Sequence, residues 1–177
     1  MKNKASNLSH TQEVDITAPN GKIITCIARG SVLIAKAKIE IYGMGKVAFP
    51  EQKEWEELKQ EKKENQRKFS QNPHKKSRLK ELKQKAANPR KSQANLSAIL
   101  KVGLSDSASD MAKIVEHLLD VGEQVTVKEQ GKLLRSKLAA PLGLLTVLSA
   151  WKVIDNDKIY LTTIKFIPPK DIQEGTL

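Results

Sequence analysis

The chain has 177 residues, a net charge of +11 at pH 7, 39% hydrophobic residues and a single cysteine. This length allows one ordinary domain or two small ones, and the composition excludes a chain that is disordered throughout. A single cysteine excludes an internal disulfide, and no apolar run approaches the roughly 18 residues of a membrane span, so we expect no membrane association and a reducing compartment. The charge excess favours a polyanionic partner, most commonly nucleic acid.

The N-terminal part of the chain begins with a polar segment and a hairpin pattern. Residues 1–12 are polar and aperiodic, so we expect a flexible extension. Val14–Thr17 and Lys22–Ala28 flank Ala18-Pro19-Asn20-Gly21, where Asn-Gly suits a tight hairpin turn. The place of Cys26 within the second apolar strand predicts a buried thiol.

A third and a fourth strand are predicted next. Ser31–Tyr42 alternates apolar and polar residues, and Lys46–Phe49 is a short strand-like run that stops at Pro50. We expect residues 13–50 to form a small antiparallel β module. Its apolar face would be covered by the C-terminal segment, by a central helix or by a second copy of the protein. Its wet face would extend a nucleic-acid surface through Lys36, Lys38 and Tyr42.

Most of the charge lies in the centre of the chain. The stretch from Lys62 to Lys91 contains twelve Lys and Arg and two Glu, a net charge of +10, whereas Glu51–Glu61 carries −3. Residues 92–177 have ten groups of each sign. This distribution predicts a solvated, charged linker over residues 51–91, because so polar a segment buries little surface.

The linker is predicted to contain two helices. Glutamates crowd the turns after Pro50 and basic residues precede Asn72-Pro73, an order that complements the helix dipole. A second, shorter helix over Ser77–Ala87 is predicted to end at Asn88-Pro89. We therefore expect a jointed segment rather than one rigid rod.

The C-terminal segment, residues 92–169, has the better helix punctuation, and residues 170–177 form a tail. Ser92–Val102 predicts a helix that ends at Gly103. Ser107 is the expected N-cap of a second helix that runs to Val121. The segment is therefore expected to fold as a helical domain.

The end of this domain is predicted to contain a third helix and a hairpin. Thr126 and Glu129 match a capping box, which predicts a helix carrying Leu133, Leu134 and Leu138. Leu144–Ile154 is almost uniformly apolar and fits a buried helix or a buried strand. Trp151–Ile154 and Ile159–Thr162 flank a polar turn and predict a hairpin.

Three helices followed by a hairpin, over about Ala108–Phe166, resemble a winged-helix domain in element order, within an overall α+β fold. The resemblance implies DNA binding through the helix nearest the hairpin. That stretch, Leu144–Ala150, has no Arg, Lys, Asn or Gln to reach base edges, which implies packing or protein contact instead. Phosphate contacts of the preceding helix would come from Lys128, Lys132, Arg135 and Lys137.

Signatures of catalysis or ligand binding fail on specific residues. His10, His74 and His117 have no Cys or second His at metal-ligand spacing. The turn that begins at Asp155 starts like a calcium loop, but Tyr160 stands where that loop needs glycine. We predict no metal, no cofactor and no enzymatic activity.

The positive signal is the basic cluster, which we interpret as a phosphate-binding segment of a nucleic-acid-binding accessory or regulatory protein. DNA is slightly favoured over RNA because of the winged-helix-like order. The alternative is a structural or assembly protein whose basic segment binds an acidic protein partner. The candidate binding residues are Lys62, Lys63, Arg67, Lys68, Lys75, Lys76, Arg78, Lys80, Lys83, Lys85, Arg90 and Lys91.

Two further expectations concern assembly and location. The C-terminal domain would mediate homodimerisation or bind a protein partner. We expect a cytoplasmic protein, with a nucleoid-associated or nuclear location as alternatives, because His74–Lys80 matches short basic targeting runs.

Overall fold

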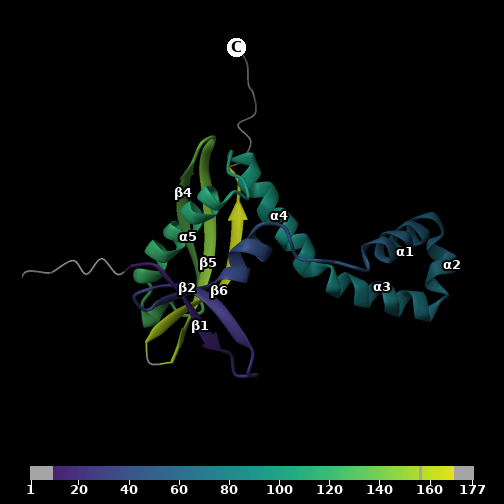
Figure 1. Cartoon of the computed structure of the whole chain (residues 1–177). Helices are drawn as coiled ribbons and strands as arrows, with labels where there is room; N and C mark the ends of the chain where they lie inside the picture. The colour runs from purple at the N-terminus through teal and green to yellow at the C-terminus, as the bar shows by residue number, and fades with distance from the viewer. Residues whose placement is uncertain (1–9, 156, 170–177) are drawn as a thin grey trace, which may run out of the picture.

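Strands from the two ends of the sequence meet in one sheet. The computed structural model describes residues 10–155 and 157–169 and confirms a mixed α+β fold. The six strands are β1 (Gln12–Thr17), β2 (Ile23–Arg29), β3 (Val32–Ala35), β4 (Leu133–Ala140), β5 (Gly143–Ile154) and β6 (Lys158–Ile167). Their order in the sheet is β1-β2-β3-β6-β5-β4 (Figure 1). Residues 1–9 of the predicted extension (residues 1–12) lie outside the described residues. The whole predicted tail, residues 170–177, also lies outside them.

The predicted N-terminal hairpin is confirmed. β1 and β2 pair antiparallel, with Val14 opposite Cys26, and Gly21 adopts the positive φ of +78° that the turn requires. Cys26 is fully buried, and this burial raises the pKa of its thiol. β3 then pairs antiparallel with β2 and parallel with β6, through Val32 and Ile159. The C-terminal segment therefore extends the N-terminal sheet at its β3 edge, and the helix Ala108–Glu123 of the same segment packs on β3. Of the three covers that the sequence leaves open, the C-terminal segment is the one that the structure shows.

The predicted strand over Ser31–Tyr42 is wrong beyond Ala35. All four residues of β3 are buried, so the alternation does not separate a wet face from a dry one. The chain continues instead into a π-helical turn, η1 (Lys38–Gly43), which packs against α4 (Ala87–Lys101) and β6. The helical spacing of four turns Ile39 and Gly43 into the protein. The short strand predicted at Lys46–Phe49 is also wrong, since these residues form an irregular connection to the helices that follow.

The predicted helix ends around Gly103 and Ser107 are confirmed. Gly103, with a φ of +77°, follows α4, and the Ser107 side chain accepts a hydrogen bond from the Asp110 amide at the start of α5 (Ala108–Glu123). The helix start is strengthened by Ser105 and Lys113, whose hydrogen bonds lower the pKa of Asp110 to about 2. α5 is amphipathic, and its apolar side lies on the sheet (Figure 1).

The predicted third helix at residues 126–138 is wrong. The capping box of Thr126 and Glu129 forms, but it opens a single 3₁₀ turn, η2 (Val127–Glu129). Gly131 then adopts a φ of +74°, donates its N–H to the Trp151 carbonyl at 3.0 Å and turns the chain into β4. Leu134 and Leu138 alternate with exposed residues, which is a strand pattern. The winged-helix-like order over Ala108–Phe166 therefore lacks this helix, and it also lacks the next one, because Leu144–Ala150 lies in strand β5.

The apolar stretch that the sequence left undecided is a strand. β5 pairs with β4 over its first half, and the turn between them is Ala140-Pro141-Leu142-Gly143. The predicted hairpin is confirmed: Trp151 lies opposite Leu161 and Ile154 opposite Lys158.

One main core joins both halves of the sequence. Trp151 is 1% exposed, and its Nε1 donates to Ser149 Oγ at 3.0 Å. A Cβ atom on Gly122 of α5 would meet Val32 at 2.5 Å and Trp151 at 2.9 Å, so only glycine allows this approach of helix to sheet. Arg29 of β2 adds an ionic link to α5 through Glu116, Asp120 and Glu123.

Candidate functional site

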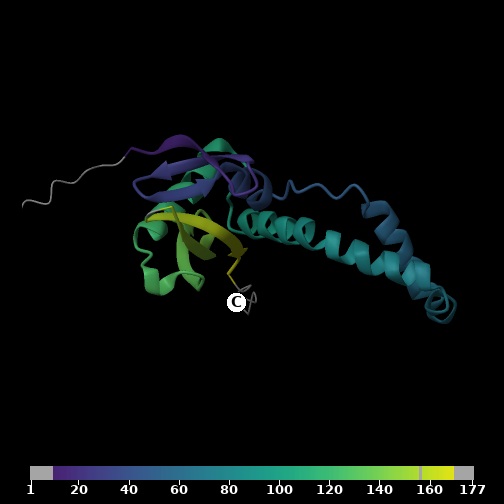
Figure 2. The same ribbon diagram turned by 90° about the horizontal axis from the view of Figure 1, so that it is seen from below.

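The central segment forms a helical arm, residues 51–91, that projects from the body (Figures 1 and 2). Its helices are α1 (Gln52–Glu64), α2 (Gln66–Ser70) and α3 (Pro73–Lys85), and α4 continues from α3 after one residue. α3 ends at Lys85, two residues before the predicted end at Ala87, but Asn88-Pro89 does not end the helical path, because α4 begins at Ala87. Proline has no backbone N–H, and the N–H groups in the first turn of a helix make no hydrogen bond within the helix. Pro89 therefore fits inside the first turn of α4.

The ends of the arm helices carry Asn caps. Asn65 separates α1 from α2 and accepts the Lys68 amide at 3.0 Å, and Asn72 accepts the Lys75 amide at 3.1 Å at the start of α3. The predicted helix end at Asn72-Pro73 is therefore confirmed. The apolar interior of the arm is small. Within helices α1 to α3 and the residue that connects α3 to α4, the buried side chains are Phe69, Leu82 and Ala86.

An ion-pair ladder joins α1 to α3 along one side of the arm. Arg78 binds Glu54 with two hydrogen bonds of 2.7 Å, a bidentate geometry. Lys75 binds Glu61 at 2.5 and 2.7 Å, and Lys85 binds Glu51 at 2.9 Å. The acidic start of the central segment thus neutralises cations of its basic remainder.

The ladder shifts the pKa values of its members. The hydrogen bond from Arg78 lowers the pKa of Glu54, and the hydrogen bond from Lys85 lowers that of Glu51. Glu81 reaches both cations within α3, at 3.0 and 3.1 Å, and its pKa is lowered in the same way. The pKa of Arg78 rises because of its bonds to Glu54 and Glu81.

A basic groove lies on another side of the same helices. It has a volume of about 550 Å³. Within the described residues, its lining contains five cations and no acidic side chain. The lining residues are Trp55, Lys59, Lys62, Lys63, Gln66, Leu79, Lys83 and Arg90. We call this feature the arm groove.

Trp55 is the aromatic centre of the arm groove. The Lys59 Nζ lies 4.2 Å from the centroid of its ring and the Arg90 Cζ lies 5.9 Å from it, both within cation–π range. Phe49 meets the indole edge-on, with the ring centroids 5.8 Å apart. These contacts hold a half-buried indole among cations.

The twelve predicted residues divide into groups with different surroundings. Lys75, Arg78 and Lys85 belong to the ladder, and Lys62, Lys63, Lys83 and Arg90 line the arm groove. Lys76 and Lys80 share a side of α3 with Lys83 by helical spacing. Arg67 and Lys68 lie in α2, and Lys91 lies in α4. Among these twelve cations, those that form an ion pair with a described residue (10–155 and 157–169) are the three ladder cations.

Four lining residues were not predicted. Lys59 falls in the part of the chain with net negative charge, and Trp55 was interpreted as part of an apolar stripe. Gln66 and Leu79 carry no charge. The spacing of Trp55, Lys59 and Lys62 at i, i+4 and i+7 is the sequence signal that places them on one side of α1.

The other predicted contact residues lie on the body. Lys36 forms ion pairs with Glu13 at 2.7 Å and Glu40 at 3.7 Å, so its charge is neutralised. Lys38 and Tyr42 lie in η1, and the ammonium of Lys38 is 5.5 Å from the centroid of the Tyr42 ring. Lys128 lies in η2, Lys132 follows it, and Arg135 and Lys137 lie in β4 rather than on a helix.

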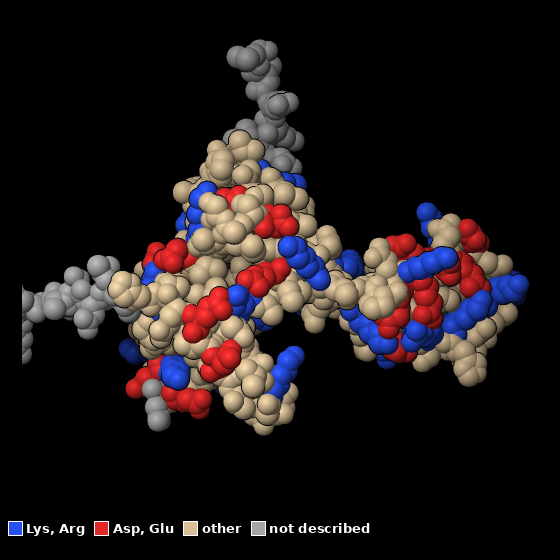
Figure 3. All heavy atoms as spheres, in the orientation of Figure 1, with Lys and Arg blue, Asp and Glu red and all other residues tan. Residues whose placement is uncertain are grey.

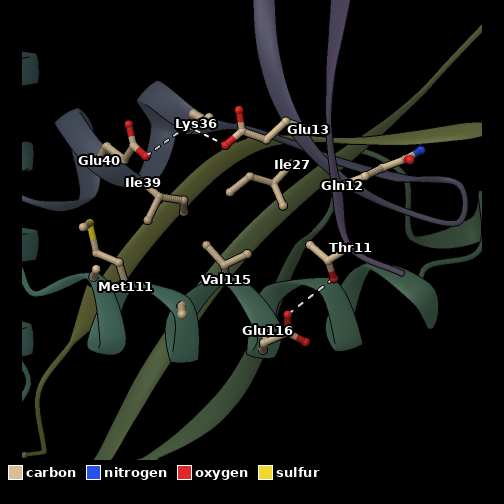
Figure 4. A pocket seen from close by; sticks show the side chains of 12 residues that line it. Thr11, Gln12, Glu13, Ile27, Lys36, Ile39, Glu40, Met111, Val115 and Glu116 are labelled. Atoms are coloured by element: carbon tan, nitrogen blue, oxygen red, sulfur yellow. Dashed lines mark hydrogen bonds and ion pairs between the residues drawn. The ribbon is translucent and has the colours of Figure 1, made fainter. Parts of the chain in front are cut away.

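A hollow on the body differs from the arm groove in charge. It has a volume of about 400 Å³ and lies between the sheet and α5 (Figure 4). Ile27, Ile39 and Val115 form an apolar floor, and glutamates dominate the charged rim. This hollow is poorly suited to a polyanion.

Figure 3 shows acidic and basic side chains side by side on the arm, at the right of the view. In the part of the chain that the structure describes, no three His, Cys, Asp or Glu side chains gather as metal ligands, and every helix is too short or too polar to cross a lipid bilayer.

Comparison with known proteins adds no relationship: no protein-family model matches the sequence, and a search of curated proteins finds no match.

Proposed function

We propose that this protein is a non-enzymatic nucleic-acid-binding accessory or regulatory protein that holds phosphates with its helical arm. The observation that carries the proposal is the arm groove, where Lys59, Lys62, Lys63, Lys83 and Arg90 surround Trp55. Among the described lining residues none is acidic. Five cations without carboxylate partners in the groove are suited to a ligand with several negative charges.

The groove cations also repel one another. Lys59 and Lys63 stand four residues apart on α1, a spacing at which like charges destabilise a helix. A polyanion would relieve this repulsion and release its own counterions, and both effects favour binding at low salt. The Trp55 indole offers a face on which an unpaired base can stack.

The test compares DNA with RNA and single strands with duplexes. The preference for DNA depended on a winged-helix-like order, and the second and third helices of that order are replaced by β4 and β5. We therefore propose nucleic acid in general. Because the groove contains a tryptophan on which an unpaired base can stack, we expect single strands to bind at least as well as duplexes.

The test is a titration of labelled duplex DNA, single-stranded DNA and structured RNA at about 50 and 200 mM salt. At least one of them should bind at low salt and weaken about 10³-fold or more at the higher salt if six or more phosphates are contacted. The variant Lys62→Glu, Lys63→Glu, Lys83→Glu, Arg90→Glu should lose binding. The variant Lys128→Glu, Lys132→Glu, Lys152→Glu, Lys158→Glu changes net charge equally on the body and should keep most of it.

A second candidate function is the binding of an acidic protein segment. The observation that favours it is the apolar part of the groove, Trp55 and Leu79, which would receive hydrophobic side chains of an amphipathic acidic helix. A complex that survives nuclease treatment and high salt would support this function. Loss of the complex under both treatments would favour nucleic acid.

A further inference from the structure

A pocket lies where the helical arm joins the body. It has a volume of about 510 Å³ and is built from η1, the first half of α4 and the C-terminal half of β6. These three elements are far apart in the sequence and are brought together by the packing of α4 on η1 and β6. We call it the junction pocket. Its lining residues are Tyr42, Ala87, Arg90, Lys91, Ala94, Asn95, Thr163, Ile164 and Lys165.

The lining is cationic and rich in hydrogen-bond donors. Arg90 and Lys91 come from α4 and Lys165 comes from β6, and all three side chains are exposed. Within the described part of the chain, no acidic residue lines the pocket. The hydroxyl groups of Tyr42 and Thr163 add neutral donors. This combination of guanidinium, ammonium and hydroxyl groups matches the oxygen atoms of a phosphate.

Asn95 forms part of the inner wall of the pocket. It is 2% exposed, and its Oδ1 accepts the Phe166 amide at 3.0 Å, which fixes the side chain against β6. Among the described residues, its Nδ2 has no hydrogen-bond partner and is closed to solvent. Asn95 therefore holds α4 against β6 beside the pocket and leaves ligand contacts to the exposed cations.

The junction pocket and the arm groove share one lining residue. Arg90 lines both, and the groove extends from it along α1 and α3. A strand that lies in the groove and reaches Arg90 therefore arrives at the mouth of the pocket.

We propose that the junction pocket is a phosphate-binding site on the body, formed by Arg90, Lys91 and Lys165 with the hydroxyl groups of Tyr42 and Thr163 as neutral donors. One part of this inference rests on the proposed function, namely the source of the phosphate. The phosphate belongs to the backbone of the nucleic-acid strand that occupies the arm groove. The strand then touches both regions of the molecule, so that binding fixes the direction of the arm relative to the body.

The first experiment uses inorganic phosphate as the probe. The full chain, labelled with ¹⁵N, is titrated with phosphate at constant ionic strength. We expect saturable shifts of the Asn95 side-chain amide and of the backbone amides of Thr163 and Lys165. Lys165→Gln, at an exposed position, should weaken phosphate binding about fivefold or more, whereas Lys152→Gln on the neighbouring strand β5 should not. Absence of saturable shifts, or an unchanged affinity in Lys165→Gln, would overturn the proposal.

The second experiment identifies the source of the phosphate. A 5′-mononucleotide and a single-stranded oligonucleotide of about ten nucleotides are compared in the wild type, in Lys165→Gln and in Lys62→Gln, Lys63→Gln, Lys83→Gln. If the strand spans both sites, Lys165→Gln should weaken oligonucleotide binding about three- to tenfold, and the groove variant should still bind inorganic phosphate. Tight binding of the mononucleotide that the oligonucleotide does not displace would support the pocket and contradict the strand as its source.

The two proposals fail in different ways. If phosphate binds at Lys165 but no nucleic acid binds, the junction pocket stands and the proposed function fails. If nucleic acid binds in the arm groove while Lys165→Gln has no effect on any probe, the proposed function stands and the junction pocket fails.

Discussion

The body and the helical arm are held together by different interactions. The body surrounds Trp151 with strands from both ends of the sequence, and its main core is large and dry. The arm has few buried side chains, and α1 is joined to α3 by three ion pairs that are partly open to solvent. Exposed ion pairs contribute little stability each, so the arm is expected to be the weaker part.

This difference explains how one run of positive charge serves two purposes. Cations that face Glu51, Glu54 and Glu61 form the ion pairs of the ladder, which hold the arm together. Cations on another side of the same helices line the arm groove. They have no carboxylate partners among its described lining residues. The division depends on which side of α3 a residue occupies and not on its place in the basic run, as the neighbours Lys83 and Lys85 show.

The largest effect is expected in the body. Trp151→Ala removes the central side chain of the core and should lower the free energy of unfolding by about 3–5 kcal/mol. Chemical denaturation followed by circular dichroism measures this. Leu144→Ala, at a residue that is 53% exposed, is the control and should change stability by less than about 0.5 kcal/mol. Equal effects of the two variants would contradict the position of the core.

A smaller and local effect is expected in the arm. Leu82 is fully buried there, and Leu82→Ala should cost about 2 kcal/mol or more, which is enough to open the arm but not the body. Trypsin should then cut within residues 51–91 faster, because this stretch is rich in Lys and Arg, and leave the body's core intact. Leu100→Ala, at a residue 53% exposed on α4, should not increase cleavage. Simultaneous unfolding of both regions would show that the arm is not a separate unit of stability.

Acid should loosen the arm before the body. The pKa values of Glu51, Glu54 and Glu81 are lowered from the usual 4.5 in the folded arm. Their contribution is therefore complete above pH 4.5 and is lost as the pH falls through the lower folded-state values. The two indole NMR signals separate the regions, since Trp55 lies in the arm and Trp151 in the body.

The matched variant for the acid experiment is Glu54→Gln, which removes one titrating group of the ladder. The Trp55 signal should respond less to pH in this variant, and the Trp151 signal should not change. An acid transition that appears at Trp151 first would contradict the comparison of the two regions.

Local signals predicted much of the fold. Asn20-Gly21 predicted the first hairpin, Ser107 predicted the start of α5, and the polar turn after Ile154 predicted the last hairpin. Each of these depends on residues within a few positions. The capping box at Thr126 is also real, yet a glycine two residues beyond it redirects the chain. A correct helix start therefore did not imply a helix.

Long-range pairing was not predictable in the same way. The parallel contact of β3 with β6 joins Val32 to Ile159, and nothing near either residue specifies it. The sequence likewise identified four of the five groove cations but could not separate them from the ladder cations. That division follows from the antiparallel packing of α1 on α3, which sets Arg78 against Glu54 and leaves Lys83 in the groove.

The central claim is that the groove cations, rather than the ladder or the body, hold a polyanion. Its most direct test is the slope of log binding constant against log salt for a single-stranded oligonucleotide. Neutralising Lys62, Lys63, Lys83 and Arg90 to Gln should reduce the magnitude of this slope by about 3, from roughly 0.7 per phosphate contact. Neutralising Lys128, Lys132, Lys152 and Lys158 to Gln should leave it nearly unchanged. Equal slopes in the wild type and the groove variant would contradict the account.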